Sequence, residues 1–236
     1  MRKHYKHYLS AWLLVVLGGY WGASLGFDVV DPTTLKAVSM LHATLIIGLG
    51  YLLCPMWQYR PRRSTLLWWC LLLALAVLIM PWIDGARGLS MATTLKTATA
   101  VFLLSLSMHS LTLALSRLFP GNCWIHLHGL SVMVLFSTLP VWMAPWVESI
   151  AATPPQLHIV LWSSPLSYLA TMLDYDYLRQ QWFYRHLPYG MLRYDYPDAI
   201  YYSIGLIAAS FLMLGNTASK PVEAKSQSKR FSKPTE

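Results

Sequence analysis

The sequence predicts an all-α membrane protein, a polytopic bundle of about six transmembrane helices with one further re-entrant or interfacial helix. Composition is the first reason, because 56% of the 236 residues are hydrophobic and only 12% are charged. A soluble domain carries about 25% charged residues, so an ordinary soluble protein is excluded. Eleven Trp and fourteen Tyr fit the aromatic belts found at membrane–water boundaries. Three Cys are too few for a disulfide scaffold.

The second reason is the length of the apolar segments. A helix needs about 20 residues to cross a bilayer, at about 1.5 Å per residue. Six segments meet this length, and we expect spans at residues 9–27, 35–56, 64–83, 92–117, 126–147 and 198–216. A further segment, 156–173, is shorter, contains Pro165 and several hydroxyl groups, and follows two prolines. It fits a surface-lying or re-entrant helix better than a full crossing.

Basic residues predict the orientation, because cytoplasmic loops carry an excess of Lys and Arg. If the N-terminus is cytoplasmic and 156–173 does not cross, all the basic clusters fall on one side. The clusters are Arg2, Lys3 and Lys6; Arg60, Arg62 and Arg63; Arg117; and Lys220, Lys225, Lys229, Arg230 and Lys233. We therefore expect a multi-pass protein of the inner (cytoplasmic) membrane with both ends in the cytoplasm. This asymmetry explains the net charge of +8 more simply than nucleic-acid binding does.

We expect one transmembrane helical domain over residues 1–216. Residues 217–236 are rich in Lys, Ser and Pro, which predicts a disordered cytoplasmic tail. No cleavage site of the small-x-small type ends the first apolar segment, which we interpret as an uncleaved anchor. The three cysteines lack CxxC spacing and lie in or beside apolar segments, so we expect buried, apolar packing for them. They are Cys54, Cys70 and Cys123.

Residues 174–197, which we call the outer segment, contain six Tyr and three Arg in a chain that is otherwise poor in charge. Its three Arg lie between Asp residues at its two ends, so ion pairs and tyrosine hydrogen bonds can satisfy its polar groups. Two interpretations follow. The segment is either an aromatic anchor and Arg–Asp lattice that docks a neighbouring protein, or a direct participant in chemistry, since charges beside a membrane often mark sites.

The histidines give no metal motif. His126 and His128 are two residues apart, which places them about 200° apart on a helix and prevents them from sharing a metal ion there. His42 and His109 lie alone in apolar segments, where a neutral imidazole usually donates a hydrogen bond to a neighbouring helix. Two more histidines accompany outer carboxylates without the spacing of a metal site: His158 and His186, with Asp174 and Asp176. We find no HExxH, P-loop, GxSxG or dinucleotide-binding pattern.

Three short motifs in the outer segment carry a resemblance to a known family. They are Tyr175-Asp176-Tyr177-Leu178-Arg179, Phe183-Tyr184-Arg185 and Gly190-Met191-Leu192-Arg193. In order and approximate spacing they resemble the Tyr-x-Tyr-x-Arg, Glu-Tyr-Ile-Arg and Gly-Thr-Leu-Arg elements of the A subunit of copper membrane monooxygenases. This family includes particulate methane monooxygenase and ammonia monooxygenase. Phe183 replaces the family's Glu and Met191 replaces its Thr, so the chain resembles a divergent member.

Two weaker matches lie elsewhere and keep the same order along the chain. The sequence Trp57-Gln58-Tyr59-Arg60-Pro61 resembles the family's Trp-Glu-Arg-Tyr-Arg turn after its second span. Gly26-Phe27-Asp28 through Asp31 resembles a shortened form of the acidic stretch after its first span.

The resemblance implies a membrane subunit of a copper-dependent monooxygenase that uses O2 to hydroxylate ammonia, methane or a short alkane. Its implied partners are a cupredoxin-bearing B-type subunit and a helical C-type subunit, as a trimer of heterotrimers. Copper would be bound by these partner subunits, so no metal ligand or catalytic residue is assigned to this chain. The residues implied to be structural or interfacial are Tyr175, Tyr177, Arg179, Tyr184, Arg185, Gly190 and Arg193. An Arg fork would pair with a carboxylate on a partner or on Asp174, Asp176, Asp195 or Asp198.

Two alternatives stay open at this point. Six spans, a short basic cytoplasmic loop and a non-crossing element before the last span are also the plan of ABC-2 type exporter permeases. In that case an ATPase would dock near Arg60–Arg63. The other alternative is an accessory subunit that only anchors or assembles another complex.

Overall fold

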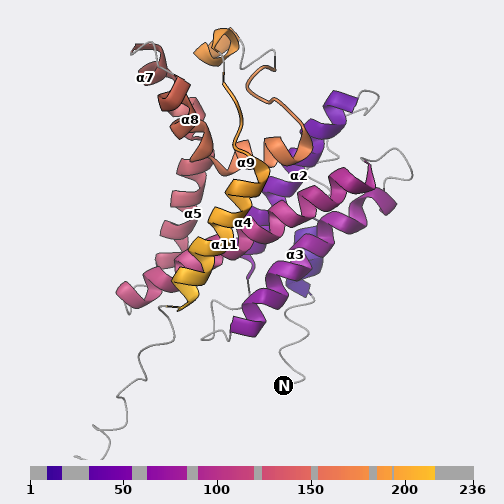
Figure 1. The fold of residues 1–236 in the computed structure, drawn as a ribbon. Helices are drawn as coiled ribbons and strands as arrows, with labels where there is room; N and C mark the ends of the chain where they lie inside the picture. Colours follow the sequence, from indigo (N-terminus) through magenta and orange to yellow (C-terminus); the bar gives the residue numbers. More distant parts are fainter. Residues whose placement is uncertain are drawn as a thin grey trace, which may run out of the picture.

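A computed structural model describes residues 10–17, 32–54, 63–83, 90–119, 124–149, 154–180, 185–192 and 194–215. In these ranges the regular structure is entirely helical, with no strand (Figure 1). Residues 10–17 form a helix, and the long helices that follow are α2 (Pro32–Leu52), α3 (Arg63–Ile83), α4 (Met91–Leu118) and α11 (Ala199–Gly215). The tail 217–236 and Cys123 lie outside the described residues.

Helix α4 is the centre of the bundle and contacts α2, α3, α9, α11 and α5 (Ile125–Ser137). Its 28 residues correspond to a length of about 42 Å. Ser90 caps its N-terminus, where the hydroxyl accepts a hydrogen bond from the Thr93 backbone N–H at 3.2 Å. Arg117 lies in the last turn, where a cation interacts favourably with the negative end of the helix dipole. The predicted span 92–117 therefore matches α4 closely.

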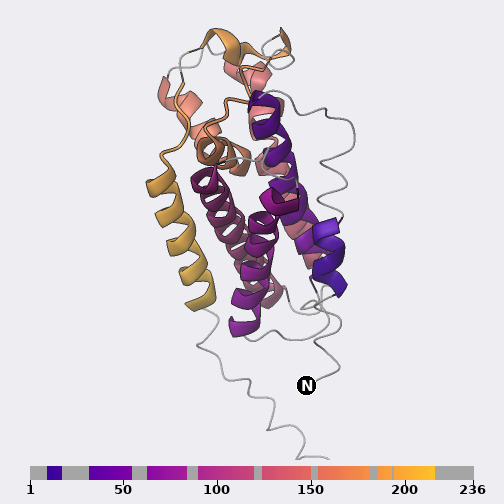
Figure 2. The same cartoon turned by 90° about the vertical axis from the view of Figure 1, so that its right-hand side faces the viewer.

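Within the described ranges, two helices are long and apolar enough to cross a membrane, Thr33–Leu52 and Met91–Leu118. Figures 1 and 2 show that α2, α4 and α11 run away from the end of the bundle that carries the outer segment, whereas α3 and α5 run toward it. The predicted segments 64–83 and 198–216 coincide with α3 and α11 within one residue.

The expectation of one continuous helix over 126–147 is wrong. The structure has three consecutive helices: α5, α6 (Leu139–Trp142) and α7 (Ala144–Ser149). Pro140 lacks a backbone N–H and its ring opposes continuation of the preceding helix. The carbonyl groups released at this break find other donors, because the Trp142 indole N–H donates to the Leu135 carbonyl at 3.0 Å and the Ser164 hydroxyl donates to the Ser137 carbonyl at 3.0 Å.

The segment 156–173 also divides, into α8 (Pro154–Trp162) and α9 (Pro165–Leu173). Each helix has nine residues and is about 14 Å long, half of the ~30 Å thickness of a hydrocarbon core. Helix α9 lies across the upper end of the bundle in Figures 1 and 2. It ends at Asp174, whose left-handed backbone (φ 49°) terminates the helix.

Between helices, a few polar side chains add to the apolar packing. The Trp12 indole N–H donates to the Leu72 carbonyl of α3 at 2.7 Å, and the Trp69 indole N–H donates to the Gly50 carbonyl of α2 at 3.1 Å. Helices α4 and α11 are joined by Ser107 and Ser210, whose hydroxyl oxygens are 2.9 Å apart. Cys54 and Cys70 are buried and are not joined in a disulfide, which agrees with the expected packing role.

Candidate functional site: a carboxylate–tyrosine cluster at the end of the bundle

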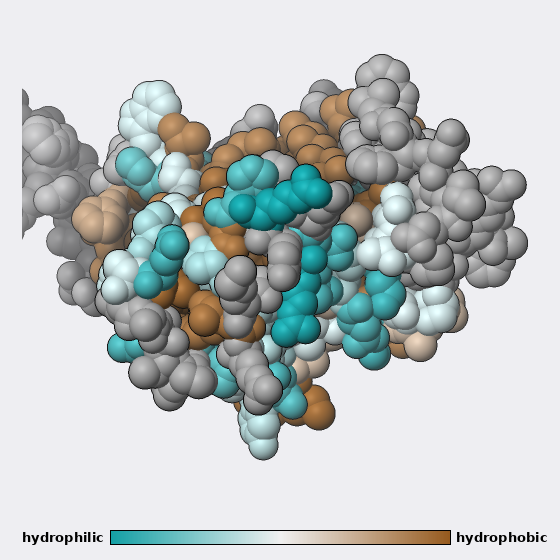
Figure 3. Space-filling view, turned by 90° about the horizontal axis from the view of Figure 1, so that it is seen from above, coloured by the Kyte–Doolittle hydropathy of each residue, from teal (hydrophilic) through white to brown (hydrophobic). Residues whose placement is uncertain are grey.

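The outer segment begins where α9 ends and finishes where α11 begins, at the upper end of the bundle in Figure 1. Viewed onto this end, Figure 3 shows hydrophilic side chains gathered in the middle of the face, with hydrophobic side chains beside them. Within the described part of the outer segment and at the start of α11, the exposed charged residues are Asp174, Arg179, Arg185, Asp195 and Asp198. Lys96 of α4 is also exposed and lies beside Asp174. We therefore treat this face as the candidate site.

Asp174 ties the end of α9 to two long helices. The Lys36 ammonium of α2 donates to the Asp174 backbone carbonyl at 2.8 Å, and the Lys96 ammonium of α4 lies 3.8 Å from its carboxylate. Both partners in the second pair are more than half exposed, so this ion pair contributes at most about 1 kcal/mol. The two lysines nevertheless place positive charge at the C-terminal end of α9, where the helix dipole favours it.

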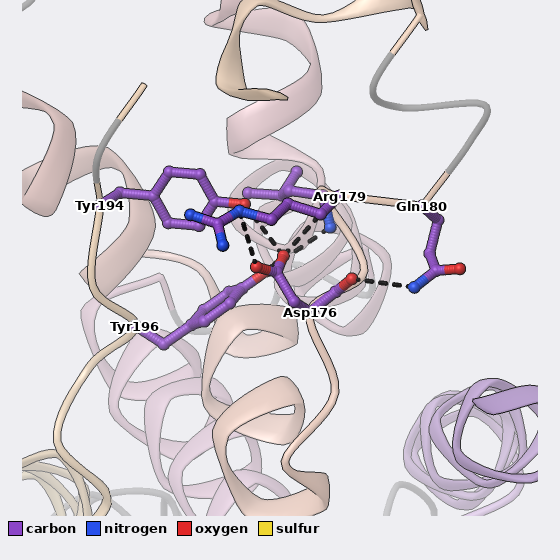
Figure 4. Close-up of polar contacts among 6 residues, drawn as sticks. Asp176, Arg179, Gln180, Tyr194 and Tyr196 are labelled. Atoms are coloured by element: carbon purple, nitrogen blue, oxygen red, sulfur yellow. Dashed lines mark hydrogen bonds and ion pairs between the residues drawn. The ribbon is translucent and has the colours of Figure 1, made fainter. Parts of the chain in front are cut away.

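Asp176 is the centre of the cluster (Figure 4). Its Oδ1 accepts hydrogen bonds from the phenols of Tyr196 at 2.7 Å and Tyr194 at 2.9 Å, and from the Arg179 backbone N–H at 3.2 Å. Its Oδ2 lies 3.4 Å from Arg179 Nε, and the Gln180 amide donates to its backbone carbonyl at 3.1 Å. One aspartate thus joins two stretches of chain that are 18 to 20 residues apart.

Local sequence explains why both phenols reach the same carboxylate. Residues 194–198 form no helix and run in an extended stretch into α11. In an extended chain alternate side chains point to the same side, so Tyr194 and Tyr196 face Asp176 while Asp195 stays exposed. Asp198 then caps the start of α11, where its Oδ1 accepts hydrogen bonds from the Ile200 N–H at 2.8 Å and the Tyr201 N–H at 3.2 Å.

The tyrosine rings of the cluster touch one another in series. Ring centroids are 6.3 Å apart for Tyr189 and Tyr194, 5.6 Å for Tyr194 and Tyr196, and 6.1 Å for Tyr196 and Tyr177. We call these four residues the tyrosine chain. The Tyr177 phenol continues into the bundle, with its oxygen 3.4 Å from the Ser167 hydroxyl of α9. Such edge-to-face and tilted contacts add to the burial of the rings.

The phenols of the tyrosine chain are held in the neutral form. Burial raises the pKa of Tyr177 to about 12, since desolvation disfavours the anion. Burial also raises the pKa of Tyr189 and Tyr194, and for Tyr194 the negative charge of Asp176 adds to the effect. For Tyr196 burial is again the largest cause of a raised pKa, followed by its hydrogen bond to Asp176. The arrangement is chemically simple: neutral phenols donate to a carboxylate that can accept a proton.

Arg179 covers the cluster from the outside. Its guanidinium carbon lies 5.2 Å from the centre of the Tyr194 ring, a cation–π contact. The contact with Asp176 uses Nε at 3.4 Å, so this pair is not a two-pronged fork, and the expectation of a fork with a partner's carboxylate stays a prediction. Because 55% of the Arg179 side chain is exposed, much of the guanidinium faces outward.

The other site residues predicted from the sequence differ in burial and in their place in the structure. Tyr175 is half-buried and packs against the core, and Tyr177 is buried. Arg185 is exposed, and Gly190 lies in the short 3-10 helix η2 (Pro188–Met191). Tyr184 and Arg193 lie outside the described residues.

Sequence reasoning missed that Asp176, Tyr194 and Tyr196 form the centre. The available signal was the repeated Tyr-Asp-Tyr pattern at 175–177 and 194–196. This pattern shows that the same residue types recur in the sequence, but it does not show that the two Tyr-Asp-Tyr stretches lie together in space.

The histidines of the bundle lie away from this cluster. His109 Nδ1 is 2.7 Å from the Ser105 carbonyl of its own helix, and the centroids of the His109 and Tyr51 rings are 5.3 Å apart in an edge-on contact. His126 is half-buried and His128 exposed, which confirms that they lie on different sides of α5. Across the described ranges, no three His, Cys, Asp or Glu side chains are grouped closely enough to hold a metal ion.

The chain was also compared with known proteins. It matches no protein-family model, no curated protein and no solved structure.

Proposed function

We propose that this chain is a membrane-embedded subunit of a copper-dependent monooxygenase complex, and that its main role is to dock partner subunits through the outer segment. The observation that carries the proposal is the ordered set of motifs in the outer segment, Tyr175-Asp176-Tyr177-Leu178-Arg179 first and Gly190-Met191-Leu192-Arg193 last. The implied reaction inserts one oxygen atom from O2 into an N–H or C–H bond of ammonia, methane or a short alkane.

The proposed topology has six crossings with both ends in the cytoplasm. Alternating helix directions in Figures 1 and 2 support it, as do the two helices that meet the length and hydropathy requirement. Large apolar side chains on α5 and α11 are exposed, among them Phe136, Ile204 and Phe211. A soluble protein rarely exposes such surfaces, whereas lipid would cover them.

The geometry of the outer segment supports docking on this face. The Asp176 cluster fixes the backbone before any partner arrives, so little ordering entropy opposes association. Arg179 and Arg185 then present exposed guanidinium groups, which bind carboxylates of a partner with two parallel hydrogen bonds. Copper is assigned to the cupredoxin-bearing B-type and helical C-type partners, and the proposed assembly is a trimer of heterotrimers.

The test is purification of the tagged chain from native membranes in nanodiscs, with mass spectrometry of its partners and copper analysis. We expect a cupredoxin-bearing subunit, a second helical subunit and copper to co-purify. Arg185→Glu should reduce recovery of these partners without reducing membrane insertion. His128→Glu, at an exposed position on the opposite end of the bundle, is the matched control and should leave recovery unchanged. Purification of the chain alone, without copper, would contradict the proposal.

A second candidate is an ABC-2 type exporter permease. It is favoured by one feature, the pair of short helices α8 and α9 that precedes the last long helix α11 without the length to cross. The same experiment separates the two, because a permease should co-purify with an ATPase and without copper.

A further inference from the structure

The tyrosine chain has a geometry suited to electron transfer between aromatic rings. Tyr189, Tyr194, Tyr196 and Tyr177 form consecutive ring pairs with centroids 5.6 to 6.3 Å apart. Three of the four rings are buried, with exposed fractions of 0% for Tyr189, 6% for Tyr177 and 8% for Tyr194. Exclusion of water protects an oxidised ring from side reactions. The tyrosine chain runs from Tyr189 in η2 to Tyr177, whose phenol lies beside Ser167 of α9.

A phenol loses an electron readily only if its proton leaves at the same time, because an oxidised phenol is a very strong acid. Asp176 Oδ1 is positioned to take that proton, at 2.7 Å from the Tyr196 phenol and 2.9 Å from the Tyr194 phenol. Both distances are within the range required of a general base, about 2.6–3.2 Å. A proton can therefore move along a hydrogen bond that already exists.

We propose that the Asp176–tyrosine cluster is a redox site that supplies one electron at a time to a one-electron oxidant derived from O2. Tyr196 gives up one electron to the oxidant and its phenolic proton passes to Asp176. The products are a neutral tyrosyl radical, a protonated Asp176 carboxyl group and an oxidant reduced by one electron. An electron from Tyr194 restores the Tyr196 phenol: the proton on Asp176 returns to the Tyr196 oxygen, the Tyr194 phenolic proton passes to Asp176 Oδ1, and the radical moves to Tyr194. The inference rests on the proposed function only for the source of the oxidant.

The position of Arg179 selects between the two phenols. Its guanidinium lies over the Tyr194 ring at 5.2 Å, and a nearby positive charge opposes the removal of an electron from that ring. Tyr196 has no such cation contact among the described residues, and its hydrogen bond to Asp176 is the shorter of the two. Tyr196 is therefore the preferred electron donor.

The test uses the full chain in nanodiscs, with a photogenerated ruthenium(III) polypyridyl complex as the oxidant and persulfate as the sacrificial electron acceptor. Electron paramagnetic resonance of rapidly frozen samples measures the tyrosyl radical. Tyr196→Phe keeps the ring but removes the phenolic hydroxyl group, and should lower the long-lived radical signal by about tenfold. Tyr201→Phe, at a tyrosine of α11 that is 72% exposed, is the control and should leave that signal unchanged. An equal signal in Tyr196→Phe and the parent chain would overturn the proposal.

A second pair of variants tests the proton acceptor. Asp176→Asn should slow radical formation by about tenfold, since the amide cannot take the phenolic proton. Asp195→Asn removes an exposed carboxylate between the two tyrosines and should have no effect. In the parent chain, radical formation should be slower in D2O than in H2O, a readout that needs no variant. Equal rates in the two solvents would overturn the proton-coupled step even if Asp176→Asn failed to fold. These experiments contain no partner subunit. A negative result would therefore contradict the redox proposal and would leave the docking proposal to be tested by co-purification.

Discussion

The helical bundle and the outer segment satisfy their polar groups in opposite ways. In α2 and α4 the hydroxyl groups mostly bond to carbonyls one turn earlier in the same helix, as Thr44 does to Met40 and Ser110 to Leu106. In the outer segment, phenols and a carboxylate from distant parts of the chain bond to one another, with Asp176 as the shared acceptor. The bundle therefore depends on packing between helices, whereas the outer segment depends on one side chain.

The largest effect is expected from Asp176→Ala. It removes the acceptor of both phenols, and an unsatisfied buried donor costs about 1–3 kcal/mol, so we expect the outer segment to lose about 3 kcal/mol of local stability. Hydrogen–deuterium exchange of peptides covering 174–180 and 194–198 measures the loss, with α4 peptides unchanged. Asp195→Ala is the matched control because Asp195 is exposed. Unchanged exchange in Asp176→Ala would show that ring packing alone holds the segment.

A packing change should instead affect the bundle. A Cβ at Gly129 would overlap the Tyr51 hydroxyl and lie 2.8 Å from Thr112 Oγ1. The Tyr51 and Thr112 hydroxyl oxygens are 2.7 Å apart and form a hydrogen bond that joins α2 to α4. We expect Gly129→Ala to destabilise the bundle by about 2 kcal/mol, measured by thermal unfolding in detergent micelles. Gly48→Ala meets no atom within 4 Å and should be neutral or stabilising by up to about 1 kcal/mol. Equal melting temperatures for the two variants would contradict this account of the α2–α4 contact.

Alkaline pH should loosen the outer segment. A phenol whose pKa is higher in the folded chain contributes stability that is complete below its unfolded pKa and is lost as pH rises. For Tyr177 the window runs from 10.0 to about 12, with a slope of about 1.4 kcal/mol per pH unit. Hydrogen–deuterium exchange of the outer segment, corrected for the intrinsic pH dependence of exchange, should rise above about pH 10. Tyr177→Phe should reduce the slope, and an unchanged slope would assign the effect to other groups.

The smallest effect is expected from Arg179→Gln. The guanidinium is 55% exposed and contacts Asp176 through a single nitrogen, so solvent screens the pair and its contribution is about 0–1 kcal/mol. The cation–π contact with Tyr194 adds at most about 1 kcal/mol at an exposed position. Exchange of the outer segment should change only slightly. A loss as large as that of Asp176→Ala would move the centre of the cluster from the carboxylate to the guanidinium.

The helices of the bundle could be predicted from sequence because helix formation in apolar segments is a local property. Segment 92–117 and α4 agree within one residue at each end. The prediction was wrong where local signals compete: 126–147 is apolar throughout, but Pro140 ends the helix and the freed carbonyls are satisfied by Trp142 and Ser164. A hydropathy profile contains no information about either of these hydrogen bonds.

The site was less predictable, because its centre joins residues 18 to 20 positions apart. The presence of both Arg and Asp in the outer segment suggested ion pairs, and one does form between Arg179 and Asp176. The hydrogen bonds from the Tyr194 and Tyr196 phenols to Asp176 are shorter than this ion pair. They depend on the path by which residues 194–198 return to the end of α9. That path is set by tertiary structure and by the capping of α11 at Asp198.

The most direct test of the proposed role is site-specific photo-crosslinking in native membranes. A photoreactive amino acid at position 185, on the exposed outer segment, should capture the cupredoxin-bearing subunit, identified by mass spectrometry of the adduct. The same amino acid at Leu71, an exposed apolar position on α3, should capture no cupredoxin-bearing subunit. An ATPase adduct, or no protein adduct at position 185 while the chain is inserted and folded, would contradict the docking role.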